Sequence, residues 1–322
     1  MQNAASDRWT RVRRALQTLG LVIGGLLLLQ QVVNAVRAVV LSEVHLQHPE
    51  YLAAAIGMST LAGGVQIIGW VLIMRRAGVR LSWLEAVRGY NLSFLPRYIP
   101  GSVWGYLSRS EWLWRYHQVA YTVSNAGSVL EVFFILLAGG IFSLAFGLPL
   151  LNINIGVVWL AGACLALIGI AFLVINKVPA LLSPLEGPLA NLLGAFPQIT
   201  LIEFMVIFAI YVALWLCHGT MLFFLTESFG YTVASILRYV VIYYVAWSVG
   251  FLVLFVPAGV GIRDTLLSRL LGSLVPLQLS QATVLSVMAR LSGLIGEIIW
   301  LSVSLFIARR TDFSRKEGTN TQ

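Results

Sequence analysis

Apolar residues in this chain come in long runs that are separated by short polar stretches. Runs long enough for a helix to cross a bilayer, roughly 20 residues, are found in six places. They are residues 16–41, 51–74, 121–147, 153–175, 203–226 and 281–308. The alternation of apolar and polar positions that a transmembrane barrel needs is missing. The pattern therefore predicts six membrane-spanning helices.

Composition and charge agree with a membrane protein and indicate how it is oriented. Of the 322 residues, 59% are hydrophobic and 11% are charged, which is too apolar for a solvated surface. The net charge of +8 comes largely from three clusters near predicted span ends, namely Arg8, Arg11, Arg13 and Arg14, then Arg75, Arg76 and Arg80, then Arg309, Arg310, Arg315 and Lys316. Cytoplasmic flanks of membrane helices collect Lys and Arg. We expect a multi-pass protein of the plasma (inner) membrane with both termini in the cytoplasm, and no nucleic-acid partner.

Residues 8–29 also resemble a secretory signal, but the apolar run continues to Leu41, so we expect no cleavage.

Two further segments are half apolar and interrupted by proline. The first covers about 84–107 and contains Pro100, and the second covers about 237–275 and contains Pro257. Proline removes a backbone donor, and broken backbone in hydrocarbon survives only inside protein or beside a watery cavity. We interpret both segments as re-entrant helical hairpins.

The spacing of these elements indicates a duplication. Pro257 follows Pro100 by 157 residues, the fifth span starts 152 residues after the second, and the last starts 160 residues after the third. The predicted fold is an all-α membrane helix bundle of six spans and two hairpins arranged as an inverted repeat, a recurrent transporter plan. We expect a cytoplasmic N-terminus (1–15), two repeats (16–147 and 153–308) and a cytoplasmic tail (309–322).

The hairpin tips carry residues suited to an anion. The predicted tips contain Pro100, Gly101 and Gly105 in the first hairpin and Pro257, Gly259 and Gly261 in the second. Arg109 follows the first tip, and Arg263 and Asp264 follow the second. A helix N-terminus offers amide donors and partial positive charge, and the planar arginine fork matches phosphate. Two such tips entering from opposite faces would enclose a polar pocket.

Ionisable residues inside spans are the other candidates for function. Glu131 forms a polar stripe with Ser124 and Ser128, and the last span repeats the arrangement with Arg290 and Glu297. We predict that Arg109, Arg263 and Arg290 contact phosphate while Glu131, Asp264 and Glu297 hold them. The alternative is that these charges form buried ion pairs that only hold helices together. His218, alone in an apolar run, is interpreted as a helix-packing hydrogen bonder.

The sequence lacks the motifs that indicate nucleotide binding, nucleophilic catalysis or metal binding. "PAGVGIRD" has neither the lysine nor the strand of a P-loop, and no nucleophile elbow is present. His45 and His48 in one loop have no third cluster to complete a metal site, and Cys164 and Cys217 lie in apolar runs. We expect no metal, no cofactor and no enzymatic activity.

Four motifs resemble those of the lysylphosphatidylglycerol synthase transmembrane region, a flippase-like family. They are "LPRYIPGSVWGYLSR", "SVLE", "VPAGVGIRDTLL" and "SVMARLSG", and the resemblance extends over about residues 16–308. Asp264 stands where the family usually has glutamate, and Ala258 replaces a glycine. The resemblance implies movement of a polar lipid headgroup between leaflets. The soluble domain of the family's namesakes does not follow Arg310, so lysyl transfer is not expected.

Three functions follow from these observations. The first is a flippase for a phosphate-bearing headgroup, with a phospholipid or a polyprenyl-phosphate glycolipid as partner. The second is a non-transporting membrane subunit that anchors or assists a glycosyltransferase of envelope synthesis. The third is an intramembrane transferase with Asp264 as its catalytic carboxylate. The identity of the lipid, the coupling to ions and the oligomeric state are left open by the sequence.

Overall fold

The structure is a computed structural model, and it describes residues 45–91, 104–149, 156–182, 187–231, 234–253, 261–275 and 277–319, with isolated positions at 29, 33, 37, 96 and 153. Within these residues the regular structure is helical. The helices are α2 (Pro49–Arg76), α3 (Trp83–Asn91), α4 (Trp104–His117), α5 (Tyr121–Gly147), α6 (Val157–Leu182), α7 (Pro188–Gly194), α8 (Leu201–Ser228), α9 (Ile236–Leu252), α10 (Ile262–Leu274) and α11 (Leu279–Thr319). The all-helical prediction is confirmed.

Five helices in the described part of the chain are long and apolar enough to cross a membrane. They are Pro49–Arg76, Tyr121–Gly147, Val157–Lys177, Leu201–Ser228 and Leu279–Ile307. Each coincides with a predicted span, so five of the six predictions are confirmed. The first predicted span, 16–41, lies outside the described residues except for three helical positions, Leu29, Val33 and Arg37.

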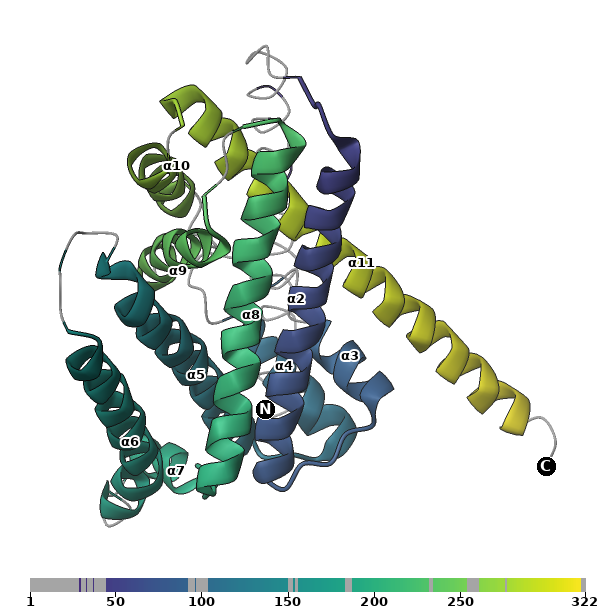
Figure 1. Cartoon of the computed structure of the whole chain (residues 1–322). Helices are drawn as coiled ribbons and strands as arrows, with labels where there is room; N and C mark the ends of the chain where they lie inside the picture. The colour runs from purple at the N-terminus through teal and green to yellow at the C-terminus, as the bar shows by residue number, and fades with distance from the viewer. Residues whose placement is uncertain are drawn as a thin grey trace, which may run out of the picture.

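Helices α2 and α8 lie side by side and antiparallel at the centre of the bundle (Figure 1). Their ends are tied together at both extremities. The backbone N–H groups of Gln47 and His48 each donate to the carbonyl of Ser228 at 3.0 Å. At the other end Arg76 forms an ion pair with Glu203. This pair of helices is the frame on which the other elements pack.

Local hydrogen bonds explain where two helices begin. Thr200 and Glu203 form a reciprocal capping box at the start of α8. Ser82 and Glu85 do the same before α3, where the Ser82 hydroxyl donates to the Glu85 carboxylate at 2.7 Å and the Ser82 N–H donates at 2.8 Å. These two hydrogen bonds lower the pKa of Glu85, and the cap lies outside the spans.

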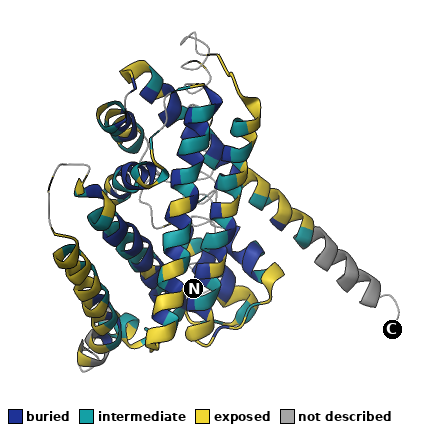
Figure 2. Cartoon of the chain, viewed as in Figure 1, coloured by how far each residue is buried: buried dark blue, intermediate teal, exposed yellow. Residues whose placement is uncertain are grey.

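The remaining helices pack around α2 and α8. Helix α5 packs against α8 and α9, while α11 packs against α2 and α3. The short helices α3 and α4 lie toward one end of the central pair and α9 and α10 toward the other (Figure 1). Helix α6 packs on α5 and α7 at the periphery, and its outer side is exposed (Figure 2).

The two proline-interrupted segments each contain a pair of short helices. Helices α3 and α4 have 9 and 14 residues, and α9 and α10 have 17 and 13. The connections that hold the predicted tip residues Pro100, Gly101, Pro257 and Gly259 lie outside the described residues. Each segment thus contains two separate short helices, and their re-entrant course stays a prediction.

The last helix is longer than the predicted span. Residues 309–319, expected to be a tail, continue α11 without interruption to Thr319. The stretch "ARRTDFSRKE" contains neither proline nor glycine, so nothing in it ends the helix. Helix α11 consequently projects well beyond the rest of the bundle (Figure 1).

Candidate ligand-binding site

A cavity of about 230 Å³ lies among the helices and is lined from eight of them, α2 to α5 and α8 to α11. This volume is enough for a cluster of waters or a small polar headgroup. Tyr90, Gly105 and Arg109 reach it from α3 and α4, and Arg263 reaches it from α10. Residues of both proline-interrupted segments therefore meet in one place, which we call the central cavity.

The first charged group at the central cavity is a buried ion pair between α4 and α5. Arg109 Nη2 lies 2.7 Å from Glu131 Oε2, and their side chains are 3% and 1% exposed. The Tyr90 hydroxyl donates to the other carboxylate oxygen at 2.6 Å. The Arg109 guanidinium also lies 4.5 Å from the Tyr90 ring centre and 5.0 Å from that of Tyr106. Both charges thus have compensating partners within the protein.

The second ion pair joins α10 to α11 and is looser. Arg290 Nη1 lies 3.3 Å from Asp264 Oδ1, and the side chains are 11% and 25% exposed. The Ser286 hydroxyl donates to the backbone carbonyl of Asp264 at 2.8 Å, which fixes α10 against α11. The position of Asp264 also depends on Gly261, whose φ of +82° favours glycine and whose N–H donates to Asp264 Oδ2 at 3.3 Å.

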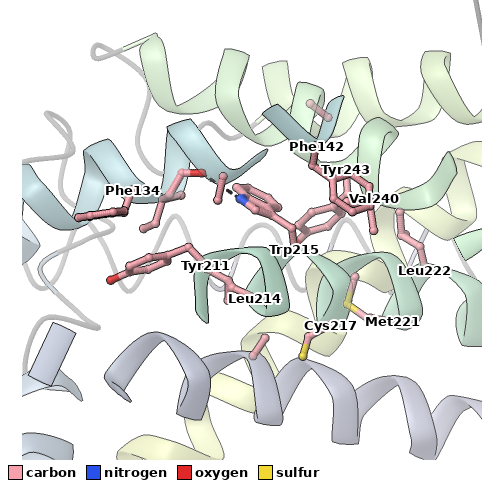
Figure 3. Close-up of a cluster of buried hydrophobic side chains, with 14 of the residues drawn as sticks. Phe134, Phe142, Tyr211, Leu214, Trp215, Cys217, Met221, Leu222, Val240 and Tyr243 are labelled. Carbon is pink, nitrogen blue, oxygen red and sulfur yellow. Dashed lines mark hydrogen bonds between the residues drawn. The ribbon is translucent and has the colours of Figure 1, made fainter. Parts of the chain in front are cut away.

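Arg263 has an aromatic side chain, Tyr243, as one of its partners. Its Nη2 donates to the Tyr243 hydroxyl, and its guanidinium carbon lies 4.9 Å from the centre of the Tyr243 ring. Tyr243 lies beside Trp215 in the buried cluster between α8 and α9 (Figure 3). Trp215 is fixed in turn, because its indole N–H donates to the carbonyl of Ile135 at 2.9 Å. A rigid aromatic wall therefore positions this cation.

Four of the six predicted charged residues line the central cavity: Arg109, Arg263, Arg290 and Glu297. The other two, Glu131 and Asp264, bind Arg109 and Arg290. Gly105 is a lining residue, whereas Gly261 begins α10 and is not one of them. Within the described residues, no three His, Cys, Asp or Glu side chains gather closely enough to hold a metal.

Several lining residues were missed by sequence reasoning. Tyr90, Trp215, Tyr243 and Asn91 all face the cavity, and His218 joins them despite its interpretation as a packing residue. Aromatic residues within apolar runs give no signal of their own, because the same residues fill cores and membrane interfaces. For His218 the signal was present, since an ionisable residue inside a span is by default a functional candidate.

The family model described as "Lysylphosphatidylglycerol synthase TM region" matches residues 17–300. This chain belongs to that family. The match includes all the helices from α2 to α10, most of α11 and therefore every described residue of the central cavity up to Trp300. Membership in the lysylphosphatidylglycerol synthase TM family confirms the resemblance seen in the motifs and is consistent with a lipid-related role in the membrane. A search of curated proteins and a search of solved structures found no match.

Proposed function

We propose that this protein moves a phosphate-bearing lipid headgroup between the two leaflets by binding it in the central cavity. The observation that carries the proposal is that three arginines from three different helices, Arg109, Arg263 and Arg290, line one cavity among membrane-spanning helices. Placing a cation inside a membrane is costly, so such residues mark ligand or ion pathways. The cavity is small, and only the headgroup enters it while the acyl or prenyl chains stay in the lipid.

The contacts of the three arginines divide them into two roles. Arg109 is almost fully buried and bound to Glu131, so it closes one wall of the cavity and orders α4 against α5. Arg263 and Arg290 are the phosphate ligands. The 3.3 Å pair with Asp264 is longer and more exposed, so Arg290 can exchange its carboxylate partner for a phosphate oxygen at lower cost. Glu297, at the same wall, balances the remaining charge.

We further propose that the halves 16–147 and 153–308 are inverted repeats, with α3 and α4 forming one re-entrant hairpin and α9 and α10 the other. The packing supports this interpretation, since α4 packs on α5 as α10 packs on α11, and α9 packs on α5 as α3 packs on α11. The central helices α2 and α8 run antiparallel. Such a relation would make the two halves interchangeable in shape, which is the basis of alternating access.

The two ion pairs occupy equivalent places in this scheme with opposite polarity. Asp264 follows Arg109 by 155 residues, and Arg290 follows Glu131 by 159. The cation is on the shorter helix in the first half and on the longer helix in the second. The Arg109–Glu131 pair is short and buried, whereas the Arg290–Asp264 pair is longer and more exposed. This difference fits one state of an alternating-access cycle, in which the half that contains α4 is closed and the half that contains α10 can accept a ligand.

A lipid translocation assay in reconstituted vesicles tests the proposal. Fluorescent phospholipid in the inner leaflet is protected from an impermeant quencher until it is moved, so the rate of quenching gives the rate of translocation. Arg263→Gln and Arg290→Gln should each slow translocation about tenfold or more, because each removes a charged hydrogen bond to phosphate. Arg115→Gln, in an exposed pair with Glu111, is the matched control and should leave the rate unchanged.

Two results would contradict the proposal. Wild-type rates in both arginine variants would remove their role as phosphate ligands. Rates in wild-type vesicles equal to those in protein-free vesicles, together with co-purification of a glycosyltransferase, would instead favour the non-transporting subunit.

A further inference from the structure

Helix α11 crosses α2 obliquely beside the central cavity, and small residues form part of the contact (Figure 1). A Cβ at Gly296 on α11 would lie 3.1 Å from backbone atoms of Ser59 and Thr60 on α2, so the two helix backbones are close together there. Ser59 and Gly296 both line the cavity. Small residues let helices in a membrane approach closely, and they leave few interlocked side chains to disengage when the helices separate.

One large side chain, Trp300, covers this contact. Trp300 lies about one turn beyond Gly296 on α11, and it also lines the central cavity. Its indole ring lies against Gly63 and Gly64 of α2, since a Cβ added at these glycines would lie 2.8 Å and 3.0 Å from ring atoms. The indole N–H donates to the carbonyl of Thr60 at 2.7 Å. The ring thus closes α11 onto α2 beside the cavity.

The outer side of the same contact is apolar and exposed. Leu61, which follows Thr60 on α2, is 53% exposed, and Ile299, which precedes Trp300 on α11, is 40% exposed. Both helices are long and apolar enough to cross the membrane, so we expect these two side chains to face lipid. The contact between α2 and α11 therefore separates the lipid from the central cavity.

The other helix contacts around the cavity are held by stronger interactions. The buried pair of Arg109 and Glu131 joins α4 to α5, and the pair of Arg290 and Asp264 joins α10 to α11. Helices α2 and α8 are tied at both ends. Separating any of these would break a charge pair or several hydrogen bonds at once. Among the described residues no ion pair joins α2 to α11, so this contact is the easiest of them to open.

We propose that the lipid enters and leaves the central cavity between α2 and α11, with Trp300 as the gate. The headgroup passes inward when the ring leaves Gly63 and Gly64, while the hydrocarbon chain stays in the bilayer because it is disfavoured among polar groups. Gly293 lines the cavity on α11, and a Cβ there would meet nothing within 4 Å, so the space behind the gate is open. The inference rests on the proposed function, because it names the route by which the same headgroup arrives.

Cross-linking α2 to α11 in the translocation assay tests the route. With Cys164 and Cys217 replaced by serine, Ser59→Cys and Gly296→Cys place two thiols at the contact. A short bis-thiosulfonate reagent joins them through disulfide bonds that dithiothreitol reverses. The probe is fluorescent phosphatidic acid in phosphatidylcholine vesicles. We expect the joined form to translocate it about tenfold or more slowly than the same protein after reduction, because the helices can no longer separate.

A second cross-link and a binding measurement are the controls. Arg76→Cys with Glu203→Cys lets the same reagent join α2 to α8, where the wild type has an ion pair. These two helices stay together during opening, so the joined and reduced forms should translocate at the same rate. Calorimetric titration in detergent with inorganic phosphate should show that the joined Ser59→Cys/Gly296→Cys protein still binds the anion.

Trp300→Phe tests the gate itself. The variant keeps a ring over Gly63 and Gly64 but loses the N–H that donates to Thr60. It should speed translocation about fivefold, which is the value of one neutral hydrogen bond, because the closed state is held less tightly. Trp159→Phe on α6, where the side chain is 79% exposed, is the matched control and should leave the rate unchanged.

The outcomes separate this inference from the proposed function. A joined Ser59→Cys/Gly296→Cys protein that translocates as fast as its reduced form would overturn the route and leave the proposed function standing. Loss of phosphate binding in the joined protein would also overturn the route, because the contact would then shape the binding site itself. An unchanged rate in Trp300→Phe would remove Trp300 as the gate. Wild-type rates equal to those of protein-free vesicles would remove the proposed function, and this inference with it.

Discussion

Arg109 and Glu131 show what a charge needs in order to lie among membrane-spanning helices. Each carboxylate oxygen has one donor, from Arg109 and from Tyr90, and the guanidinium lies over aromatic rings. Moving both charges out of water costs several kcal/mol, and this set of contacts offsets that cost only while it is complete. The two residues should therefore behave as one unit in stability measurements.

Glu131→Gln should destabilise the protein by about 3–5 kcal/mol, because it leaves the buried Arg109 cation without a counter-charge. Unfolding in mixed detergent micelles measures the change. Arg115→Gln breaks a pair whose side chains are 56% and 23% exposed, and it should cost less than about 1 kcal/mol.

A double variant separates pairing from packing at this site. Arg109→Leu combined with Glu131→Leu removes both charges and should be less damaging than Glu131→Gln alone. If Glu131→Gln were as stable as Arg115→Gln, the pair would have no structural role.

At the residue scale, the sequence indicated that acidic residues would hold the arginines but not which acid pairs with which arginine. Glu131 and Arg290 were recognised because ionisable residues inside apolar runs are rare. Their partners depend on which helix faces meet and at what depth, and no local pattern in the chain contains that information. The sequence did not place His218 and Asn91 at the cavity for the same reason, since only the packing of the helices shows that they line it.

At the scale of helices, the close packing of α8 against α9 depends on a glycine. A Cβ at Gly219 on α8 would lie 2.2 Å from the Val240 side chain and 2.9 Å from the Val240 backbone nitrogen on α9. A backbone atom cannot rotate away as a side chain can. The α8–α9 contact, which positions Tyr243 and Trp215 at the cavity, therefore depends on this glycine.

Gly219→Ala should destabilise the protein by about 1–3 kcal/mol, because the two helices must separate to admit the methyl group. Gly162→Ala on α6 is the control, since a Cβ there would meet nothing within 4 Å. That change should be neutral or stabilising by up to about 1 kcal/mol through helix propensity. Unfolding of the two variants in the same micelles compares them, and equal effects would show that the α8–α9 contact tolerates widening.

Helix ends were harder to predict than helix positions. The five confirmed spans stand out because about 20 apolar residues in succession seldom form anything but a membrane-spanning helix. The continuation of α11 to Thr319 was missed because a polar helix outside the membrane looks like any solvated segment. Hydropathy reports where a helix leaves the membrane and not where the helix ends.

For the whole molecule, the two ends of the α2–α8 pair should lie on opposite sides of the membrane. Labelling of cysteines introduced at each end can distinguish them. His45 precedes α2 and Arg80 follows it, and both are exposed. The basic cluster of Arg75, Arg76 and Arg80 should be cytoplasmic. After Cys164 and Cys217 are replaced by serine, His45→Cys should react with an impermeant thiol reagent in intact cells, and Arg80→Cys only after permeabilisation. The reverse pattern would invert the proposed topology.

Helix α6 stands apart from the rest of the molecule in how little of it is enclosed. Only 11% of its most apolar stretch is buried, against 33–39% in the other four spans. A helix that is exposed on most sides in a membrane must be long and apolar, and its sequence is otherwise little constrained. Exchanges among leucine, isoleucine, valine and phenylalanine along Val157–Lys177 should therefore have little effect on stability. We expect α6 to accumulate such substitutions during evolution faster than the other four spans.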